Sequence, residues 1–135
     1  MYNKVLCIDD DNTTLTICRL VIAKAGFAGE IITAINGREG IDFFERHVND
    51  TATLPDIVFL DLNMPVMNGW DFLEEYAARY ADKLPGVKIV ILSSTVNPED
   101  FRKAAQQPIV TDFISKPISV EALRELSERL ATNQS

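Results

Sequence analysis

Positive charge is scarce in this chain. Its 135 residues include 13 lysines and arginines against 20 aspartates and glutamates, which gives a formal net charge of −7 at pH 7. Binding to the phosphate backbone of nucleic acids depends on clustered lysine and arginine side chains. The charge balance therefore argues against a nucleic-acid partner.

Long apolar runs are missing as well. A helix needs about 20 consecutive apolar residues to cross a bilayer, and no stretch of this sequence approaches that length. The N-terminus enters a strand-like segment instead of the basic and apolar regions of a signal peptide. These absences predict a cytoplasmic protein without a membrane partner.

Cysteine and histidine are nearly absent, with two cysteines and one histidine. Cys7 lies in a strand-like apolar run and Cys18 at an apolar position of a helical pattern, so both are interpreted as small buried side chains. His47 falls near the end of a helical pattern, where a contact with the helix dipole is its expected role. Neither a disulfide framework nor a histidine–cysteine metal centre is indicated.

What the sequence does contain is a regular alternation of short apolar runs and longer amphipathic segments. The runs are rich in β-branched and aromatic residues and are bounded by polar, glycine or proline residues, which is typical of strands. The predicted strands are residues 4–8, 30–35, 57–60, 87–92 and 110–115. Helical spacing of apolar residues follows each strand, in segments around residues 12–25, 41–48, 70–80, 98–107 and 120–130.

Several helix ends carry recognisable signals. Asn12 or Thr13 is predicted to cap the first helix, and Gly26 to end it. Pro98 opens the fourth helix and Pro108 is predicted to stop it, although the sequence Gln106-Gln107-Pro108-Ile109 leaves the exact end of that helix open. Residues 49–55 are expected to form a surface loop.

Strict alternation of strands and helices predicts an α/β fold with a parallel sheet and helices on both of its faces. Five strand–helix units at ordinary element lengths account for nearly all 135 residues, which predicts one domain over residues 1–135. In such folds ligands bind at the carboxyl ends of the strands.

Acidic side chains gather at that edge. The first predicted strand is followed by Asp9, Asp10 and Asp11, and the third by Asp61. Carboxylates held close together repel one another unless a cation is present. A set of oxygen donors without histidine or cysteine favours a hard ion. A site with only a few carboxylates suits Mg²⁺ better than Ca²⁺.

Two more groups at the same edge suit a phosphoryl group. Lys116 offers a compact positive charge and Ser93 a hydroxyl donor, so together with the metal they could neutralise three phosphoryl oxygens. Asp61 is then the predicted nucleophile, since a carboxylate can accept a phosphoryl group to form an aspartyl phosphate.

This combination resembles the response-regulator receiver domain of two-component systems, over about residues 4–130. The resemblance implies a flavodoxin-like, doubly wound (βα)5 three-layer sandwich whose five-stranded parallel sheet has the order 2-1-3-4-5. The motifs that carry it are Ile8-Asp9-Asp10, Phe59-Leu60-Asp61-Leu62-Asn63-Met64-Pro65 with Met67-Asn68-Gly69, Ile91-Leu92-Ser93-Ser94, and Ser115-Lys116-Pro117.

The resemblance implies roles for the acidic residues. Asp61 corresponds to the phosphoacceptor. Asp10 and Asp61 correspond to direct Mg²⁺ ligands, Asn63 to a ligand through its backbone carbonyl, and Asp9 to a ligand through water. Asp11 lies one place beyond the acidic pair of the family and is left outside the site, as a residue that tunes the local charge or caps the first helix.

The other roles follow the same correspondence. Ser93 matches the hydroxyl that senses the phosphoryl group, and Lys116 the family lysine, which a cis Lys116-Pro117 peptide would aim into the site. Phe113 matches the aromatic switch position, without the hydroxyl of a tyrosine. Asn63 and Thr95 flank the expected phosphoryl group and are predicted to influence the lifetime of the aspartyl phosphate through water access.

By this resemblance the chain is a single-domain, chemotaxis-regulator-like response regulator without an output domain. It would accept phosphoryl from a sensor histidine kinase or a histidine phosphotransfer protein and then bind a downstream target protein, without being an enzyme in its own right. A phosphorylation-dependent homodimer remains open. The alternatives are an aspartate-nucleophile phosphohydrolase, against which Asn63 stands where a general acid is needed, and a constitutive adaptor with an unused site.

Overall fold

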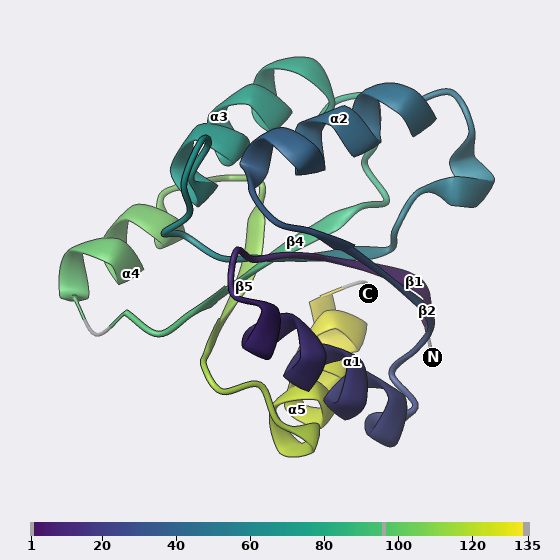
Figure 1. The fold of residues 1–135 in the computed structure, drawn as a ribbon, viewed down its shortest axis with the longest axis vertical. Coiled ribbons are helices and arrows are strands. Elements are labelled where there is room, and N and C mark those ends of the chain that lie inside the picture. The colour runs from purple at the N-terminus through teal and green to yellow at the C-terminus, as the bar shows by residue number, and fades with distance from the viewer. Residues whose placement is uncertain (1, 96, 134–135) are drawn as a thin grey trace.

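Strands and helices alternate along the whole chain in the computed structural model, which describes residues 2–95 and 97–133. Each strand is followed by one α-helix, and a single 3-10 turn precedes the third strand (Figure 1). The elements are β1 (Tyr2–Ile8), α1 (Asn12–Ala25), β2 (Ala28–Ala34), α2 (Gly37–His47), η1 (Thr51–Thr53), β3 (Ile57–Leu60), α3 (Gly69–Arg79), β4 (Lys88–Ser93), α4 (Pro98–Ala105), β5 (Val110–Ser115) and α5 (Val120–Asn133).

The five strands form one parallel sheet in the order β2-β1-β3-β4-β5. Helices α1 and α5 cover one face, and α2, α3 and α4 cover the other (Figure 1). Two apolar cores fill the layers, one between the sheet and α1 and α5, the other between the sheet and the remaining helices. The predicted three-layer α/β architecture and strand order are confirmed.

The central strands owe their position to their composition. All four residues of β3 are buried, as are the last four of β1, so both strands present apolar side chains to both cores. The prediction for β3 and that for β5 agree with the structure residue by residue. β1 and β2 begin two residues earlier than predicted, because Tyr2 pairs with Ala28 and donates its N–H to the carbonyl of Phe27 at 2.9 Å.

Two further strand boundaries differ by one residue. β2 ends at Ala34 and not at residue 35, because the next residues belong to the cap of α2. The Asn36 side chain accepts the N–H of Glu39, and the Glu39 carboxylate accepts the N–H of Ile35 at 3.0 Å. β4 runs from Lys88 to Ser93, one residue later than predicted at both ends.

The cap of α1 is Asp11, which confirms one of the two roles expected for this residue, and neither Asn12 nor Thr13 caps the helix. The Asp11 carboxylate accepts the backbone N–H of Thr13 at 3.0 Å and the hydroxyl of Thr14 at 3.1 Å. Its charge also suits the positive end of the helix dipole. The helix ends at Gly26 in a left-handed conformation, as predicted.

The end of α4 lies three residues before Pro108. The helix stops at Ala105 with Gln106 as its cap, because the proline ring disfavours a helical conformation at Gln107. The predicted loop 49–55 contains the turn Thr51–Thr53, in which Asp50 accepts the N–H of Ala52.

The two cysteines and His47 lie where the sequence predicts them, and the aromatic side chains of the α3 region differ in burial. Cys7 and Cys18 are buried free thiols, and His47 is the last residue of α2. Tyr76 and Tyr80 are buried, whereas Trp70 is only half-buried and carries Lys103 over its ring at 4.5 Å. Within residues 2–95 and 97–133, no helix has the length and apolar character needed to span a membrane.

Candidate functional site

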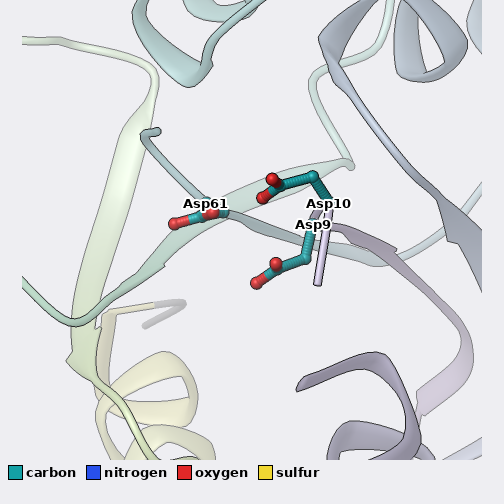
Figure 2. Close-up of side chains that lie close together, drawn as sticks. All are labelled: Asp9, Asp10 and Asp61. Atoms are coloured by element: carbon teal, nitrogen blue, oxygen red, sulfur yellow. The ribbon is translucent and has the colours of Figure 1, made fainter. Parts of the chain in front are cut away.

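Three carboxylates meet at the carboxyl edge of the sheet. Asp9 and Asp10 follow β1, and Asp61 follows the neighbouring strand β3; one oxygen of each lies within 4.8 Å of the others (Figure 2). Asp9 and Asp61 are buried and Asp10 is exposed. The predicted convergence of these residues is therefore present in the folded chain.

Backbone hydrogen bonds hold these residues in place. The N–H of Asp61 donates to the carbonyl of Ile8 at 2.9 Å, and the N–H of Asp9 to that of Ala34 at 3.0 Å. The Asp9 carboxylate also accepts the N–H of Asp11 at 2.9 Å. Asp9 and Asp61 thus continue the register of the sheet and do not depend on flexible loops for their position.

Gly69 brings the start of α3 against the backbone at the end of β3. Its N–H donates to the Leu62 carbonyl at 3.0 Å. A Cβ at this position would lie 2.8 Å from the Leu62 Cα and would collide with the Asp61 carbonyl oxygen. Only glycine permits this close approach, which fixes the backbone on which the Asp61 carboxylate is mounted.

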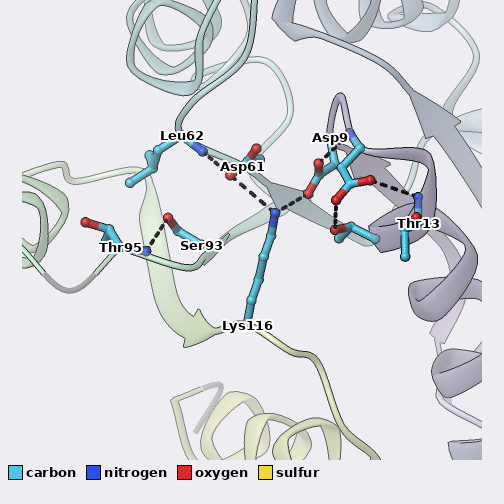
Figure 3. Close-up of polar contacts among 9 residues, drawn as sticks. Asp9, Thr13, Asp61, Leu62, Ser93, Thr95 and Lys116 are labelled. Carbon is cyan, nitrogen blue, oxygen red and sulfur yellow. Dashed lines mark hydrogen bonds and ion pairs between the residues drawn. The ribbon is translucent and has the colours of Figure 1, made fainter.

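Lys116 reaches the carboxylates from the end of β5. Its Nζ lies 2.7 Å from Asp9 Oδ2 and 3.6 Å from Asp61 Oδ1 (Figure 3). Burial lowers the pKa of Lys116, but the hydrogen bond to Asp9 and the charge of Asp61 outweigh it and raise the pKa above its ordinary value. The lysine is therefore a permanent positive charge. The Lys116-Pro117 peptide is cis, as the resemblance implied.

The pKa of the Asp61 carboxyl is raised in this site. Burial, followed by the negative charge of Asp9, raises the pKa of Asp61 to about 6, against the opposing effects of Lys116 and of the Leu62 N–H that its carboxylate accepts at 2.9 Å. At neutral pH most Asp61 side chains are ionised, yet their charge is poorly solvated. A nucleophilic carboxylate that binds a cation is the chemistry this environment favours.

The donor set fits a hard divalent cation. Among the described residues, Asp9, Asp10 and Asp61 form the acidic group that could hold a metal, and all of their donors are oxygens. A cation there would relieve the repulsion that raises the Asp61 pKa. Asn63 lies two residues beyond Asp61 in the β3–α3 connection, with an exposed side chain.

Ser93 closes the site from β4. It is fully buried, and its Oγ accepts the backbone N–H of Thr95 at 3.2 Å (Figure 3). Its carbonyl accepts the N–H of Lys116 at 2.9 Å, which ties the ends of β4 and β5 together. The structure thus brings Ser93 and Lys116 to the same strand edge as the carboxylates.

Two residues with contacts to this region were missed by sequence reasoning. The Thr95 hydroxyl donates to the Asp100 carboxylate in α4 at 2.6 Å, and the ring of Phe101 packs on that of Phe113 with centroids 4.5 Å apart. Asp100 lies in the first turn of α4 and Phe101 follows it in the same helix, so neither residue belongs to a motif of the site. Only the spacing of Thr95 and Asp100 across a helix start could have indicated their contact.

Comparison with known proteins decides the family. Residues 5–128 match the sequence profile described as Response regulator receiver domain. The chain belongs to this family. The receiver domain is 33% identical over 135 residues to the chemotaxis protein CheY of Thermotoga maritima, in an alignment that covers 95% of this chain and 100% of that protein.

Other relatives show the same domain in different settings. The receiver domain is 29% identical over 125 residues to the sensor histidine kinase CheAY of Helicobacter pylori, covering 93% of this chain but only 14% of the kinase. Among solved structures, a two-component response regulator from Cytophaga hutchinsonii superimposes with a TM-score of 0.87 at 26% identity, over 97% of this chain and 98% of that one. The receiver domain is therefore homologous to response regulators of two-component systems.

Proposed function

We propose that Asp61 accepts a phosphoryl group from a phosphohistidine on a sensor histidine kinase or histidine phosphotransfer protein, and that the aspartyl phosphate changes the affinity of this receiver domain for a downstream target protein. The observation that carries the proposal is the position of Asp61, a buried carboxylate 3.6 Å from Lys116 and beside two further carboxylates. Membership of the receiver-domain family supports the donor class.

Mg²⁺ is the proposed cofactor. Asp10 and Asp61 would bind it directly, Asn63 through its backbone carbonyl and Asp9 through a water molecule. Bound there, the ion would supply charge neutralisation for phosphoryl oxygens. The three-carboxylate set at the sheet edge supports this assignment, because it otherwise concentrates negative charge around Asp61.

The phosphoryl transfer needs only one covalent step from the protein, the attack of Asp61 on phosphorus. An Asp61 carboxylate oxygen forms a bond to phosphorus as the phosphorus–nitrogen bond of the phosphohistidine breaks, and the imidazole leaves with the electron pair. Lys116 balances charge on one phosphoryl oxygen, and the Ser93 hydroxyl donates a hydrogen bond to another. Alignment and charge neutralisation thus account for the reaction.

The product is expected to persist long enough to act as a signal. A phosphohydrolase with an aspartate nucleophile needs a general acid two residues after it, and Asn63 cannot supply a proton. This receiver domain is therefore proposed to be a signalling phosphoacceptor and not a turnover enzyme. Phe113 is proposed to respond to Ser93 when the phosphoryl group binds, and Asn63 to influence how long that group survives.

The test uses acetyl phosphate as a small phosphoryl donor. With Mg²⁺ present, intact-mass measurement should find a species heavier by one phosphoryl group, stable in acid and labile in base. Asp61→Asn, or excess EDTA, should abolish it. The constitutive adaptor would be favoured instead if the wild-type chain gained no phosphoryl group from any small donor and Mg²⁺ left its melting temperature unchanged.

A further inference from the structure

The hydroxyl of Thr95 is committed to helix α4. It donates its proton to Asp100 Oδ2 at 2.6 Å and accepts the backbone N–H of Asn97 at 3.2 Å. A hydroxyl has one proton to donate, so the Asp100 contact uses it fully. In Figure 3 this hydroxyl points away from Lys116 and the carboxylates. The side chain of Thr95 is therefore directed to the first turn of α4.

The backbone of Thr95 acts in the other direction. Its N–H donates to Ser93 Oγ at 3.2 Å and so occupies an acceptor position of the Ser93 hydroxyl. Ser93 keeps its own proton available for a phosphoryl oxygen, and the Thr95 N–H biases where that proton can point. A continuous chain of contacts thus runs from Asp100 through Thr95 to the hydroxyl of Ser93.

Helix α4 has little apolar packing to hold its first turn. Of its described residues, Ala104 near the C-terminal end is the buried one. Its side-chain contacts include the ring pair of Phe101 with Phe113 and the cation–π contact of Lys103 with Trp70. The hydrogen bond between Thr95 and Asp100 joins the first turn of this helix to the residues that follow β4.

We infer that Asp100 is a positioning residue for the phosphoryl site: it holds Thr95, whose backbone N–H orients the hydroxyl of Ser93. This inference rests on the proposed function. It also gives Thr95 a role different from control of water access, since its side chain serves as the link to α4.

Beryllofluoride with Mg²⁺, a stable substitute for the phosphoryl group, provides the test on the full chain by isothermal titration. Asp100→Ala and Thr95→Val should each lower its affinity about three- to tenfold, the loss expected for one orienting hydrogen bond. The double variant should lose no more than either single variant, because both break the same link. Thr95→Ser keeps the hydroxyl and should bind beryllofluoride with the affinity of the wild type.

Two controls separate positioning from general destabilisation. Glu99→Ala removes another acidic residue from the same helical turn, at an exposed position, and should leave the affinity unchanged. In a Ser93→Ala background, Asp100→Ala should have no further effect. An unchanged affinity in Asp100→Ala, additive losses in the double variant, or an equal loss without the Ser93 hydroxyl would overturn the inference. A wild-type chain that binds no beryllofluoride would overturn the proposed function and this inference with it.

Discussion

Asp61→Asn should stabilise this receiver domain at neutral pH in the absence of a divalent cation. The substitution removes a buried negative charge but keeps the size of the side chain and an oxygen that can accept the Leu62 N–H. The folded chain holds Asp61 at a pKa of about 6, against an ordinary value of 3.8. The folded state thus disfavours the ionised form relative to the unfolded chain.

The pKa difference sets the magnitude. A shift of about two units corresponds to roughly 3 kcal/mol, at 1.36 kcal/mol per unit, as an upper limit for the penalty at pH 7. The attraction of Lys116 is already contained in this pKa, so we expect a gain of up to about 3 kcal/mol. For a domain of this size each kcal/mol raises the melting temperature by roughly 3–5 °C.

The pH dependence has a definite sign. Between the unfolded and folded pKa values of Asp61 the folded state binds more protons, so the penalty is absent below about pH 4 and complete above about pH 6. Thermal melts of wild type and Asp61→Asn in EDTA should therefore converge near pH 4 and separate by pH 7. Asp82→Asn, at an exposed position, is the control and should shift little. A destabilised Asp61→Asn, or an offset independent of pH, would refute this account of the site.

Three further predictions concern the metal and the backbone around the site. Mg²⁺ should raise the melting temperature of the wild-type chain because it binds the folded state, and Asp10→Ala should remove this effect; an unchanged shift would place the ion elsewhere. Gly69→Ala should lower the free energy of unfolding by about 2 kcal/mol or more and impair phosphorylation, because the added methyl group displaces the backbone at Asp61. Gly86→Ala is the control: the space around Gly86 is open, so this variant should melt like the wild type. Val66→Gly should raise the free energy of unfolding measured in urea by up to about 1 kcal/mol. A β-branched residue at φ 68° is strained and glycine is not, although the entropy that glycine loses on folding offsets part of the gain. A lower free energy of unfolding would show that the strain is absent.

Much of the fold could be predicted because its signals are local. Five buried apolar runs, each followed by helical spacing, determine the order of strands and helices, and the topology of parallel sheets does the rest. Boundaries were harder where a side chain competes for the same backbone groups. Asp11 and Asn36 cap helices at positions where the apolar pattern alone favoured a later start or a longer strand.

The site divides in the same way. The convergence of Asp9, Asp61 and Lys116 could be predicted because each directly follows a strand, and strand ends meet at one edge of a parallel sheet. The contact of Thr95 with Asp100 left only a weak signal, the five-residue spacing across the start of a helix, because it depends on the path of the β4–α4 connection and on the rotamer of one hydroxyl. Such a contact leaves no periodic pattern of apolar residues in the sequence.

The central claim is that Asp61, among the acidic residues of the site, receives the phosphoryl group. Treating the acetyl-phosphate product with borohydride reduces an acyl phosphate to an alcohol, so the modified aspartate becomes homoserine and can be located by tandem mass spectrometry. The account predicts homoserine at position 61 in samples phosphorylated with Mg²⁺ and at no position when EDTA is present. Homoserine at position 9 or 10, or its absence from position 61 in a chain that has gained a phosphoryl group, would contradict it.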